Sequence, residues 1–437
     1  MGGYVEALGY LYGLAPRGIR LELDRMRAAL ALRGDPQRGL RVIHVAGTNG
    51  KGSVAAVIES ALRRAGLETG LYTSPHLHRF TERIRVGGRA VTEREVARTV
   101  RSIRETLDRP GAPPLTFFET TTLLAFELFR ARGCELVVLE VGLGGRLDST
   151  NVVEGRELCV ITRLALEHTD RLGDTLGAIA GEKAGILESG VPAVVGVREP
   201  EAREVIDHRA RELGAPVRWI DRDFGVEARE RAKPGRGRGT GRLTVRVGDR
   251  RLEGLRVPFA GAHQQDNVAL AVASLCTLAE VRGVPVQEAA IREGLERCRW
   301  PGRLERIGGA PPVLLDAAHN PDACAALGAH LDELPRSRRV LVFGAMADKD
   351  HEGMLAAFDG RVDRRLYTAP RLDRAAAPAA LARVRPGQTA RDVPAAVDRA
   401  RRLAGEDGLV VVAGSIFAMA EARAHLLGVR TDPPIAM

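Results

Sequence analysis

Short runs of apolar residues alternate with longer segments of helical spacing between residues 41 and 213. The apolar runs are strand-sized and fall at residues 41–45, 69–72, 136–141, 158–162 and 192–196. Segments with apolar residues three and four positions apart, typical of helices, fall at residues 53–65, 93–107, 116–132, 176–187 and 200–213. Buried parallel strands are almost uniformly apolar and need helical connections between them. This alternation therefore predicts a mostly parallel sheet with helices on both faces.

The stretch from residue 221 to residue 257 breaks this pattern. Residues 227–241 are charged and rich in glycine, and the run Pro234–Gly239 cannot hold a helix. Residues 242–247 and 251–257 alternate in polarity, as the strands of an antiparallel hairpin do. We expect a solvated loop before this hairpin, with contact to a polyanion as the alternative, and assign no chemistry to Lys233 within it.

A break at Trp300-Pro301-Gly302-Arg303 follows two helical segments at residues 262–281 and 286–297. A second series of strands and helices comes after it, with strand-sized runs at residues 313–315, 340–343, 364–367 and 409–412. The predicted fold class is α/β. A P-loop-type, mostly parallel sheet forms the N-terminal domain, residues 1–298, and a smaller Rossmann-like α/β domain spans residues 299–437.

Composition excludes several classes of protein. The 437 residues are 45% apolar, too many for a disordered chain. Apolar runs long enough to cross a membrane are missing, and the N-terminal residues do not resemble a signal peptide. The five cysteines show no CxxC spacing, which is typical of reduced thiols in a cytoplasmic protein.

The net charge of +9 first suggests nucleic-acid binding. Aromatic residues make up only 4% of the chain, however, so platforms for base stacking are scarce. The charge better suits attraction of anionic small molecules. Only four of the 65 basic residues are lysines, and these are Lys51, Lys183, Lys233 and Lys349. A genome rich in G and C is the simple explanation of this preference for arginine, and under that pressure each retained lysine is a position to examine for a use of a compact or deprotonated amine.

The segment Val45-Ala46-Gly47-Thr48-Asn49-Gly50-Lys51-Gly52-Ser53 lies between a predicted strand and a predicted helix. Its glycines let backbone N–H groups surround phosphate oxygens at a helix N-terminus. Lys51 would meet the β- and γ-phosphates, and the hydroxyl of Ser53 would ligate Mg²⁺. The strict G-x-x-x-x-G-K-[ST] pattern is not met, because Gly52 separates the lysine from the serine.

Three further residues are candidate metal ligands or reactive groups because of their positions in the predicted strands and helices. Glu140 ends an apolar strand, where a carboxylate suits Mg²⁺, with an arginine ion pair as the alternative. His168 follows another strand, as a ligand or as a hydrogen-bonding loop residue. Lys183 lies inside an apolar helix, where burial favours a neutral amine that can add CO₂ to form a carbamate. Pairing of Lys183 with Glu182 or another acid is the alternative.

Two other motifs are incomplete. Residues 142–147 miss the last glycine of G-x-G-x-x-G, and no G-x-S-x-G elbow occurs. A dinucleotide-binding site and a serine hydrolase are therefore disfavoured. In the second domain, residues 316–321, 348–350 and 414–415 each follow a predicted strand, so they gather at one edge of the sheet, where ligand clefts form.

Taken in order, these motifs resemble the folylpolyglutamate synthase and dihydrofolate synthase family, within the Mur ligase superfamily. The resemblance runs from about residue 16 to residue 416 and rests on residues 45–53, 74–77, 118–119, 140–148, 182–186, 301–303 and 316–321. It implies an ATP-dependent ligase, with an ATP-binding Mur ligase-like domain followed by a glutamate ligase domain. A folate carboxylate would attack ATP to give an acyl phosphate, which the amino group of L-glutamate would then open.

The resemblance also implies site residues and cofactors. Lys51, Lys183, His168 and Glu140 would be catalytic. ATP would contact Gly47, Thr48, Asn49, Gly50, Lys51, Gly52, Ser53, Asn267, Arg303 and Asp316. One Mg²⁺ would be held by Ser53, Ser74 and Glu140, and a second by His168 and carbamylated Lys183, with a monovalent cation as an additional candidate. The folate or dihydropteroate site would include Phe117, Phe118, Glu119, Leu147, Asp148, Ser149, Arg17 and Ile19. Glutamate would meet residues 316–321, with His319 and Ser415. We expect a cytoplasmic monomer that binds neither nucleic acid nor membrane.

The chain departs from the family pattern at Glu167, where aspartate is usual, and at Glu22, where glycine is usual. Two rival functions are kept. A peptidoglycan Mur ligase would act on a UDP-sugar, but the short segment before residue 45 leaves no room for the usual UDP-binding domain. A nucleotide-dependent scaffold would bind nucleic acid in a salt-sensitive way and would have no use for Glu140, His168 or Lys183.

Overall fold

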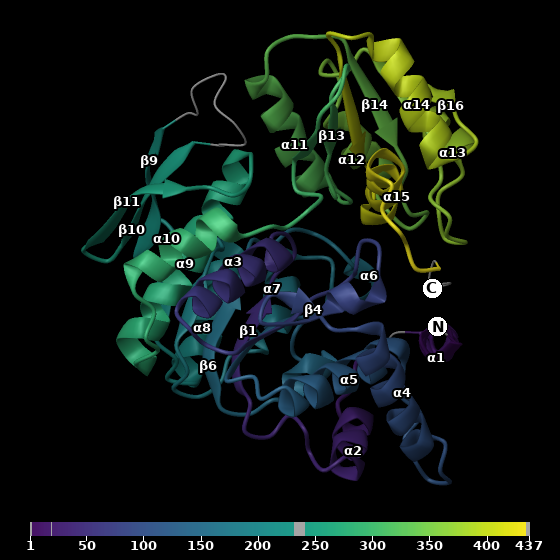
Figure 1. The fold of residues 1–437 in the computed structure, drawn as a ribbon. Coiled ribbons are helices and arrows are strands. Elements are labelled where there is room, and N and C mark those ends of the chain that lie inside the picture. Colours follow the sequence, from purple (N-terminus) through teal and green to yellow (C-terminus); the bar gives the residue numbers. More distant parts are fainter. Residues whose placement is uncertain (1, 19, 231–240, 434–437) are drawn as a thin grey trace. The chain divides into compact units, whose positions relative to one another are not determined.

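The computed structural model describes residues 2–18, 20–230 and 241–433 (Figure 1). The chain divides into two compact units. The first comprises Met1–His76, Phe80–Pro258 and Gln264–Arg299, and the second Leu77–Arg79, Phe259–His263 and Trp300–Met437. Two residues discussed above, Ile19 and Lys233, lie outside the described residues. The domain boundary between residues 298 and 299 stays a prediction.

The first unit contains a large sheet with the strand order β4-β3-β2-β5-β1-β6-β7-β8. The strands are β1 Arg41–Ala46, β2 Thr69–Tyr72, β3 Ile84–Val86, β4 Arg89–Ala90, β5 Leu136–Glu140, β6 Arg156–Ile161, β7 Ala193–Val195 and β8 Val217–Trp219. The six strands from β2 to β8 in this order run parallel, and β3 and β4 continue the sheet antiparallel at one edge. The predicted mostly parallel sheet is confirmed, and the loops after its parallel strands share one edge.

Helices flank this sheet. They are α1 Gly2–Tyr12, α2 Asp24–Leu32, α3 Lys51–Arg64, α4 Glu93–Leu107, α5 Phe117–Ala131, α6 Thr169–Leu172, α7 Leu176–Ala184, α8 Pro200–Glu212, α9 Ala262–Arg282 and α10 Glu288–Arg297, with 3-10 turns η1 Ala15–Arg17, η2 Phe80–Arg83 and η3 Ser149–Val152. Buried alanines and isoleucines of α7 and α8 pack against one face of β6 and β7. Helix α4 has the predicted bounds because Thr92 and Glu95 form a capping box at its start.

An antiparallel sheet of three strands follows β8 in the chain. Its strands are β9 Phe224–Glu230, β10 Arg242–Val247 and β11 Arg250–Arg256, in the order β11-β10-β9. The predicted hairpin of β10 and β11 is confirmed. The prediction that residues 227–230 belong to a loop is wrong, because they extend β9 along β10 through backbone hydrogen bonds that tolerate exposed charged side chains.

The second unit is built on a sheet with the order β12-β13-β17-β14-β15-β16. Its elements are β12 Glu305–Ile307, β13 Val313–Leu315, α11 Pro321–Glu333, β14 Arg339–Phe343, α12 His351–Ala356, β15 Arg364–Tyr367, α13 Pro378–Val384, β16 Gln388–Thr389, α14 Val393–Ala404, β17 Leu409–Ala413 and α15 Ile416–Leu427. All neighbours are parallel except β12 and β13. The four predicted strands are present, and the sequence pattern missed only the short edge strands β12 and β16 in the described part of this unit.

Across the described ranges, none of the helices combines the length and the apolar character that crossing a bilayer requires.

Candidate active site

The loop between β1 and α3 has the backbone shape that its glycines predict. Gly47 has φ 145° and Gly50 has φ 92°, values that favour glycine. A Cβ atom on Gly50 would lie 2.4 Å from Oδ1 of Asn267, which is on α9. The fold therefore brings Asn267, a predicted nucleotide contact, against the phosphate loop from a distant part of the chain.

The backbone N–H groups of this loop have two different uses. Those of Thr48 and Asn49 donate to the carbonyl oxygen of Arg163, at 3.0 and 3.2 Å, and so brace the loop against the end of β6. Those of residues 51–53 lie in the first turn of α3, where a helix offers no carbonyl to accept them. The first turn, with its positive helix dipole, is the part suited to a phosphate.

The side chains of Lys51 and Ser53 differ in their surroundings. Nζ of Lys51 donates to the carbonyl oxygens of Gly47 and Thr48, each at 3.0 Å, so the ammonium lies over the loop. Ser53 is 1% exposed, and its Oγ is buried without a hydrogen-bond partner in the described residues. A buried hydroxyl left unpaired costs stability. Oγ of Ser53 is therefore suited to bind a ligand.

Ser74 and Glu140 meet at the same edge of the sheet. Glu140 ends β5 and is 5% exposed, and its Oε2 accepts a hydrogen bond from the backbone N–H of Ser74 at 3.0 Å. Because β5 lies between β1 and β2, the segments carrying Ser53, Glu140 and Ser74 leave three adjacent parallel strands. The carboxylate and the two hydroxyls are oxygen ligands of the kind that Mg²⁺ prefers.

Lys183 on α7 is 4% exposed. Burial, followed by the nearby positive charge of Lys51, lowers the pKa of Lys183 to about 7, although Glu167, Asp148 and Glu182 act in the opposite direction. A substantial fraction of this amine is therefore neutral near pH 7. Glu182 pairs with the guanidinium of Arg146, at 2.7 Å, rather than with Lys183. The simple Glu182 pair considered as the alternative is thus not formed.

His168 lies in the loop between β6 and α6 with φ 53°. Its Nε2 is 3.9 Å from Oε1 of Glu167, the position at which the chain differs from the family pattern. Within the described residues, no three His, Cys, Asp or Glu side chains are grouped closely enough to hold a metal by themselves. The two metal sites expected at Ser53, Ser74, Glu140, His168 and Lys183 stay predictions.

The two carboxylates predicted for the folate site, those of Glu119 and Asp148, accept hydrogen bonds from other groups of the protein. Oε2 of Glu119 accepts a hydrogen bond from the backbone N–H of Thr116, at 2.7 Å, and Oε1 accepts one from Nη2 of Arg25, at 3.0 Å. Arg25 also pairs with Glu22. Oδ2 of Asp148 accepts the N–H groups of Gly142 and Leu143, at 3.1 and 2.9 Å. These carboxylates fix the start of α5 and the loop after β5.

The other residues predicted for this site vary in exposure. Phe117 is buried, Phe118 and Leu147 are half-buried, and Arg17 is exposed and donates to the carbonyl of Leu115 at 2.7 Å. Oγ of Ser149 is buried 3.0 Å from Oγ1 of Thr122. Phe118 and Leu147 are therefore the predicted folate-site residues whose apolar side chains are partly accessible.

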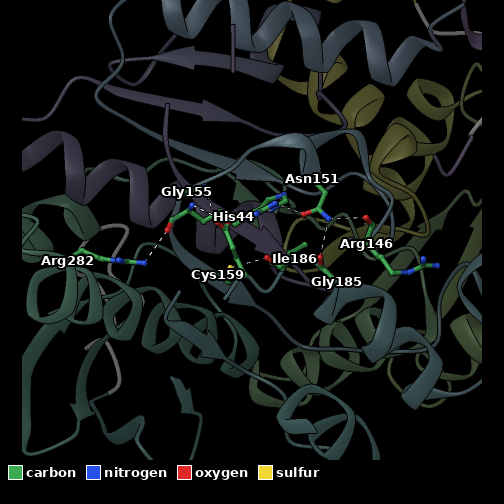
Figure 2. A network of polar contacts seen from close by, with 10 residues as sticks. His44, Arg146, Asn151, Gly155, Cys159, Gly185, Ile186 and Arg282 are labelled. Atoms are coloured by element: carbon green, nitrogen blue, oxygen red, sulfur yellow. Dashed lines mark hydrogen bonds and ion pairs between the residues drawn. The ribbon is translucent and has the colours of Figure 1, made fainter. Parts of the chain in front are cut away.

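A buried polar network, which joins the loop after β5 through Asp148, was not predicted from the sequence (Figure 2). Nε of Arg156 donates to Nδ1 of His44, at 3.2 Å, and Nε2 of His44 lies 2.8 Å from Oγ1 of Thr150. Oγ1 of Thr150 donates to Oδ1 of Asp148 at 2.5 Å. Burial, and then the charge of Arg156, hold the pKa of His44 well below its usual range. The only sequence signal was a histidine within an apolar strand.

The same network reaches the end of α7. Nδ2 of Asn151 donates to the carbonyls of Arg146 and Gly185, at 2.9 and 3.1 Å, and Sγ of Cys159 donates to the carbonyl of Ile186 at 3.1 Å (Figure 2). Helix α7 ends at Ala184, three residues earlier than predicted, and these bonds fix the turn that follows. They therefore help to position Lys183.

In the second unit, the predicted residues gather around the end of β13. Oδ2 of Asp316 accepts the N–H of Leu304, at 2.8 Å, and Oδ1 accepts that of Ala318, at 2.9 Å. Nδ1 of His319 lies 2.8 Å from the carbonyl of Ala317. Asp316 therefore holds the turn that follows Arg303.

Ser415 and Arg303, two further predicted residues of this unit, form local hydrogen bonds. Ser415 caps α15 through the N–H groups of Phe417 and Ala418, at 3.1 and 3.0 Å. Nη1 of Arg303 donates to the carbonyl of Gly302 at 3.0 Å. The strand ends that the sequence predicted to form one ligand edge do belong to one sheet.

Comparison with protein families matches residues 45–275 to the Mur ligase middle domain and residues 302–416 to the Mur ligase glutamate ligase domain. The dihydrofolate synthase/folylpolyglutamate synthase of Escherichia coli is 40% identical over 366 residues, which cover 83% of this chain and 81% of that protein. That of Bacillus subtilis is 37% identical over 357 residues, covering 80% of this chain and 82% of the relative.

Some relatives are much longer. The probable bifunctional folylpolyglutamate synthase/dihydropteroate synthase of Haloferax volcanii is 37% identical over 96% of this chain, but the chain spans only about half (50%) of its length.

Two solved structures are closely similar to this chain in fold. The folylpolyglutamate synthase of Mycobacterium tuberculosis complexed with ADP gives a TM-score of 0.90 at 31% identity, covering 98% of this chain and 100% of that one. Escherichia coli FolC in complex with DHPP and ADP gives 0.85 at 35% identity, covering 95% and 96%.

Proposed function

Because the chain belongs to the folylpolyglutamate synthase/dihydrofolate synthase family of Mur ligases, we propose that it uses ATP to join L-glutamate to folates. The observation that carries the proposal is the convergence of Ser53, Ser74, Glu140 and Lys183 around the phosphate loop. A nucleotide-binding scaffold without ligase chemistry has no use for a buried acid and a partly neutral buried lysine beside that loop.

The reaction proceeds in two steps. An oxygen of the acceptor carboxylate attacks the γ-phosphorus of ATP, ADP leaves, and an acyl phosphate forms. The amino group of L-glutamate then attacks the acyl carbon, and the tetrahedral intermediate collapses to an amide with loss of phosphate and a proton. The first turn of α3 and the ammonium of Lys51 stabilise the phosphate charge, since positioning and charge neutralisation dominate such transfers.

The oxygen groups at the sheet edge fit a magnesium ion. Oγ of Ser53 is buried without a protein partner in the described ranges, and the carboxylate of Glu140 is buried beside Ser74. We assign these three residues to one Mg²⁺, and His168 and Lys183 to a second. Bound magnesium would neutralise phosphate charge, whereas the protein groups orient the loop on which ATP lies.

Lys183 fits a carbamate. A neutral amine is needed to add CO₂, and the pKa of Lys183 is lowered to about 7 by burial and by Lys51. Carbamylation converts a buried cation into an oxygen ligand, which removes the repulsion from Lys51 and suits a metal that prefers oxygen.

We further propose that the enzyme accepts both dihydropteroate and tetrahydrofolate, and that it works as a cytoplasmic monomer without nucleic-acid or membrane partners. Activity is tested by phosphate release with ATP, Mg²⁺, L-glutamate and each acceptor in turn. Glutamate-dependent release with both acceptors supports both activities. Release with neither acceptor would sink the ligase proposal.

A further inference from the structure

Arg83, at the end of η2, carries a buried guanidinium that the sequence did not single out. The residue is 3% exposed, and its Nε donates to Nδ1 of His76 at 2.9 Å. Within the part of the chain that the structure describes, Nη1 and Nη2 form no hydrogen bond or ion pair with the protein. A desolvated cation with unpaired donors is costly, so its outer nitrogens are suited to an anionic ligand.

Two aromatic rings hold the guanidinium in place. Its Cζ lies 5.1 Å from the ring centroid of Phe117 and 5.9 Å from that of Phe80, distances at which a cation is attracted to a ring face. Burial lowers the pKa of Arg83, and the neighbouring Tyr72, Tyr12, Glu140 and Glu82 oppose that shift. With Nε anchored and the plane set by the rings, the Nη1–Nη2 edge remains for a ligand.

The backbone places Arg83 beside the predicted reaction centre. The N–H of Thr73 donates to the carbonyl oxygen of Arg83, at 2.9 Å, and the next residue, Ser74, bonds Glu140. On its other side, the guanidinium lies against Phe117 at the start of α5. Arg83 therefore stands between the predicted magnesium ligands and the predicted folate side.

We propose that Arg83 binds the reacting carboxylate of the acceptor substrate through Nη1 and Nη2, an assignment that rests on the proposed ligase function. The planar fork of a guanidinium matches the two oxygens of a carboxylate. This contact offsets the repulsion between the carboxylate and the phosphates of ATP, and it holds one carboxylate oxygen toward the γ-phosphorus. Arg83 is thus a substrate-binding residue of the first step.

The test is equilibrium binding of pteroate and of pteroamide, in which the carboxylate is replaced by a neutral carboxamide. Wild type is expected to bind pteroate at least tenfold more tightly than pteroamide. Arg83→Met, which keeps an apolar side chain against Phe117, is expected to bind the two ligands equally. Arg89→Met is the matched control, because Arg89 is exposed on β4, and it should keep the wild-type preference.

Each outcome decides the assignment. Equal binding of both ligands by wild type, or an undiminished preference in Arg83→Met, contradicts it. If Arg83→Met does not fold, Arg83→Lys is used in its place. One ammonium cannot reproduce the two-pronged geometry of a guanidinium, so the preference for pteroate over pteroamide should fall at least threefold. An unchanged preference in Arg83→Lys then overturns the assignment. If wild type binds no pteroate at all, the proposed function fails, whereas binding without preference removes only the role of Arg83.

Discussion

The guanidinium of Arg156 donates from Nε to Nδ1 of His44 at 3.2 Å, inside the large sheet. A guanidinium cannot accept a hydrogen bond, so Nδ1 of His44 must be the acceptor. The neutral ring therefore carries its proton on Nε2 and donates to Oγ1 of Thr150, which in turn donates to Asp148. The direction of every bond in this buried chain is fixed, and it ends at the carboxylate that holds the N–H groups of Gly142 and Leu143.

Replacing His44 should change how stability depends on pH. The pKa of His44 is lowered in the folded state by burial and Arg156, so below about pH 6.5 the unfolded chain binds a proton that the folded chain does not. Stability rises with pH wherever the unfolded state binds more protons. Wild type should therefore lose up to about 1.4 kcal/mol per pH unit more than His44→Gln as the pH falls from 6 to 5.

Urea unfolding of both proteins at several pH values measures this difference. The exposed His208 on α8 supplies the control, because His208→Gln should follow the wild-type curve. Parallel curves for wild type and His44→Gln would show that His44 is not held neutral.

Lys183→Arg should reduce activity at least a thousandfold although the charge is kept. A guanidinium cannot form a carbamate, and a larger cation would be buried where the pKa of lysine is already lowered to about 7. The measurement is glutamate-dependent phosphate release. Lys233→Arg is the control, since we assigned no chemistry to that lysine, and it should be unchanged. Near-normal turnover in Lys183→Arg would falsify the carbamate.

Activity should fall on the acid side of about pH 7 and should depend on CO₂. As the pH drops through the pKa of Lys183, which is about 7, the amine becomes protonated and no longer adds CO₂. Removing CO₂ at pH 6.5 should lower activity severalfold, and added bicarbonate should restore it. Labelling with ¹³CO₂ followed by NMR reports the carbamate directly. A bicarbonate effect of equal size in Lys183→Ala would argue against this explanation.

Gly50→Ala should weaken ATP binding at least tenfold. The new Cβ would lie 2.4 Å from Oδ1 and 2.9 Å from Cγ of Asn267, so the whole amide must move away from the phosphate loop. Gly66→Ala is a matched control, because Gly66 has φ 91° against 92° for Gly50, but a Cβ there meets no atom within 4 Å.

Both variants of this pair should lose about 1–2 kcal/mol from left-handed backbone strain. Only Gly50→Ala should raise the Kd for ATP, measured by calorimetry. Equal effects of the two substitutions on ATP binding would mean that Asn267 does not contribute to the site.

Local pattern was sufficient to predict the phosphate loop and five strands of the large sheet, β1, β2, β5, β6 and β7, but it did not predict the short strands β3, β4 and β8. Strand β2 and helix α4 have the predicted bounds because the apolar run and the capping box are contained within a few residues. Residues 227–230 were misassigned because an edge strand forms through backbone pairing, which charged side chains do not prevent.

The buried residues that support the site are brought together by long-range contacts that no local sequence pattern contains. His44 and Arg156 are 112 positions apart, and nothing near either residue in the sequence indicates the other. Arg83 was overlooked because one arginine among 61 carries no signal until its burial and its aromatic neighbours are known. Long-range packing therefore determines which of the many charged residues take part in chemistry.

The central claim is that a substrate carboxylate is activated by phosphorylation and then joined to glutamate. Dihydropteroate labelled with ¹⁸O in its carboxylate tests it most directly, with ATP, Mg²⁺ and L-glutamate in unlabelled water. Attack on the γ-phosphorus predicts that one ¹⁸O atom appears in each phosphate released and that the amide product retains the other. Glutamate-dependent product formation with unlabelled phosphate would contradict the acyl phosphate route.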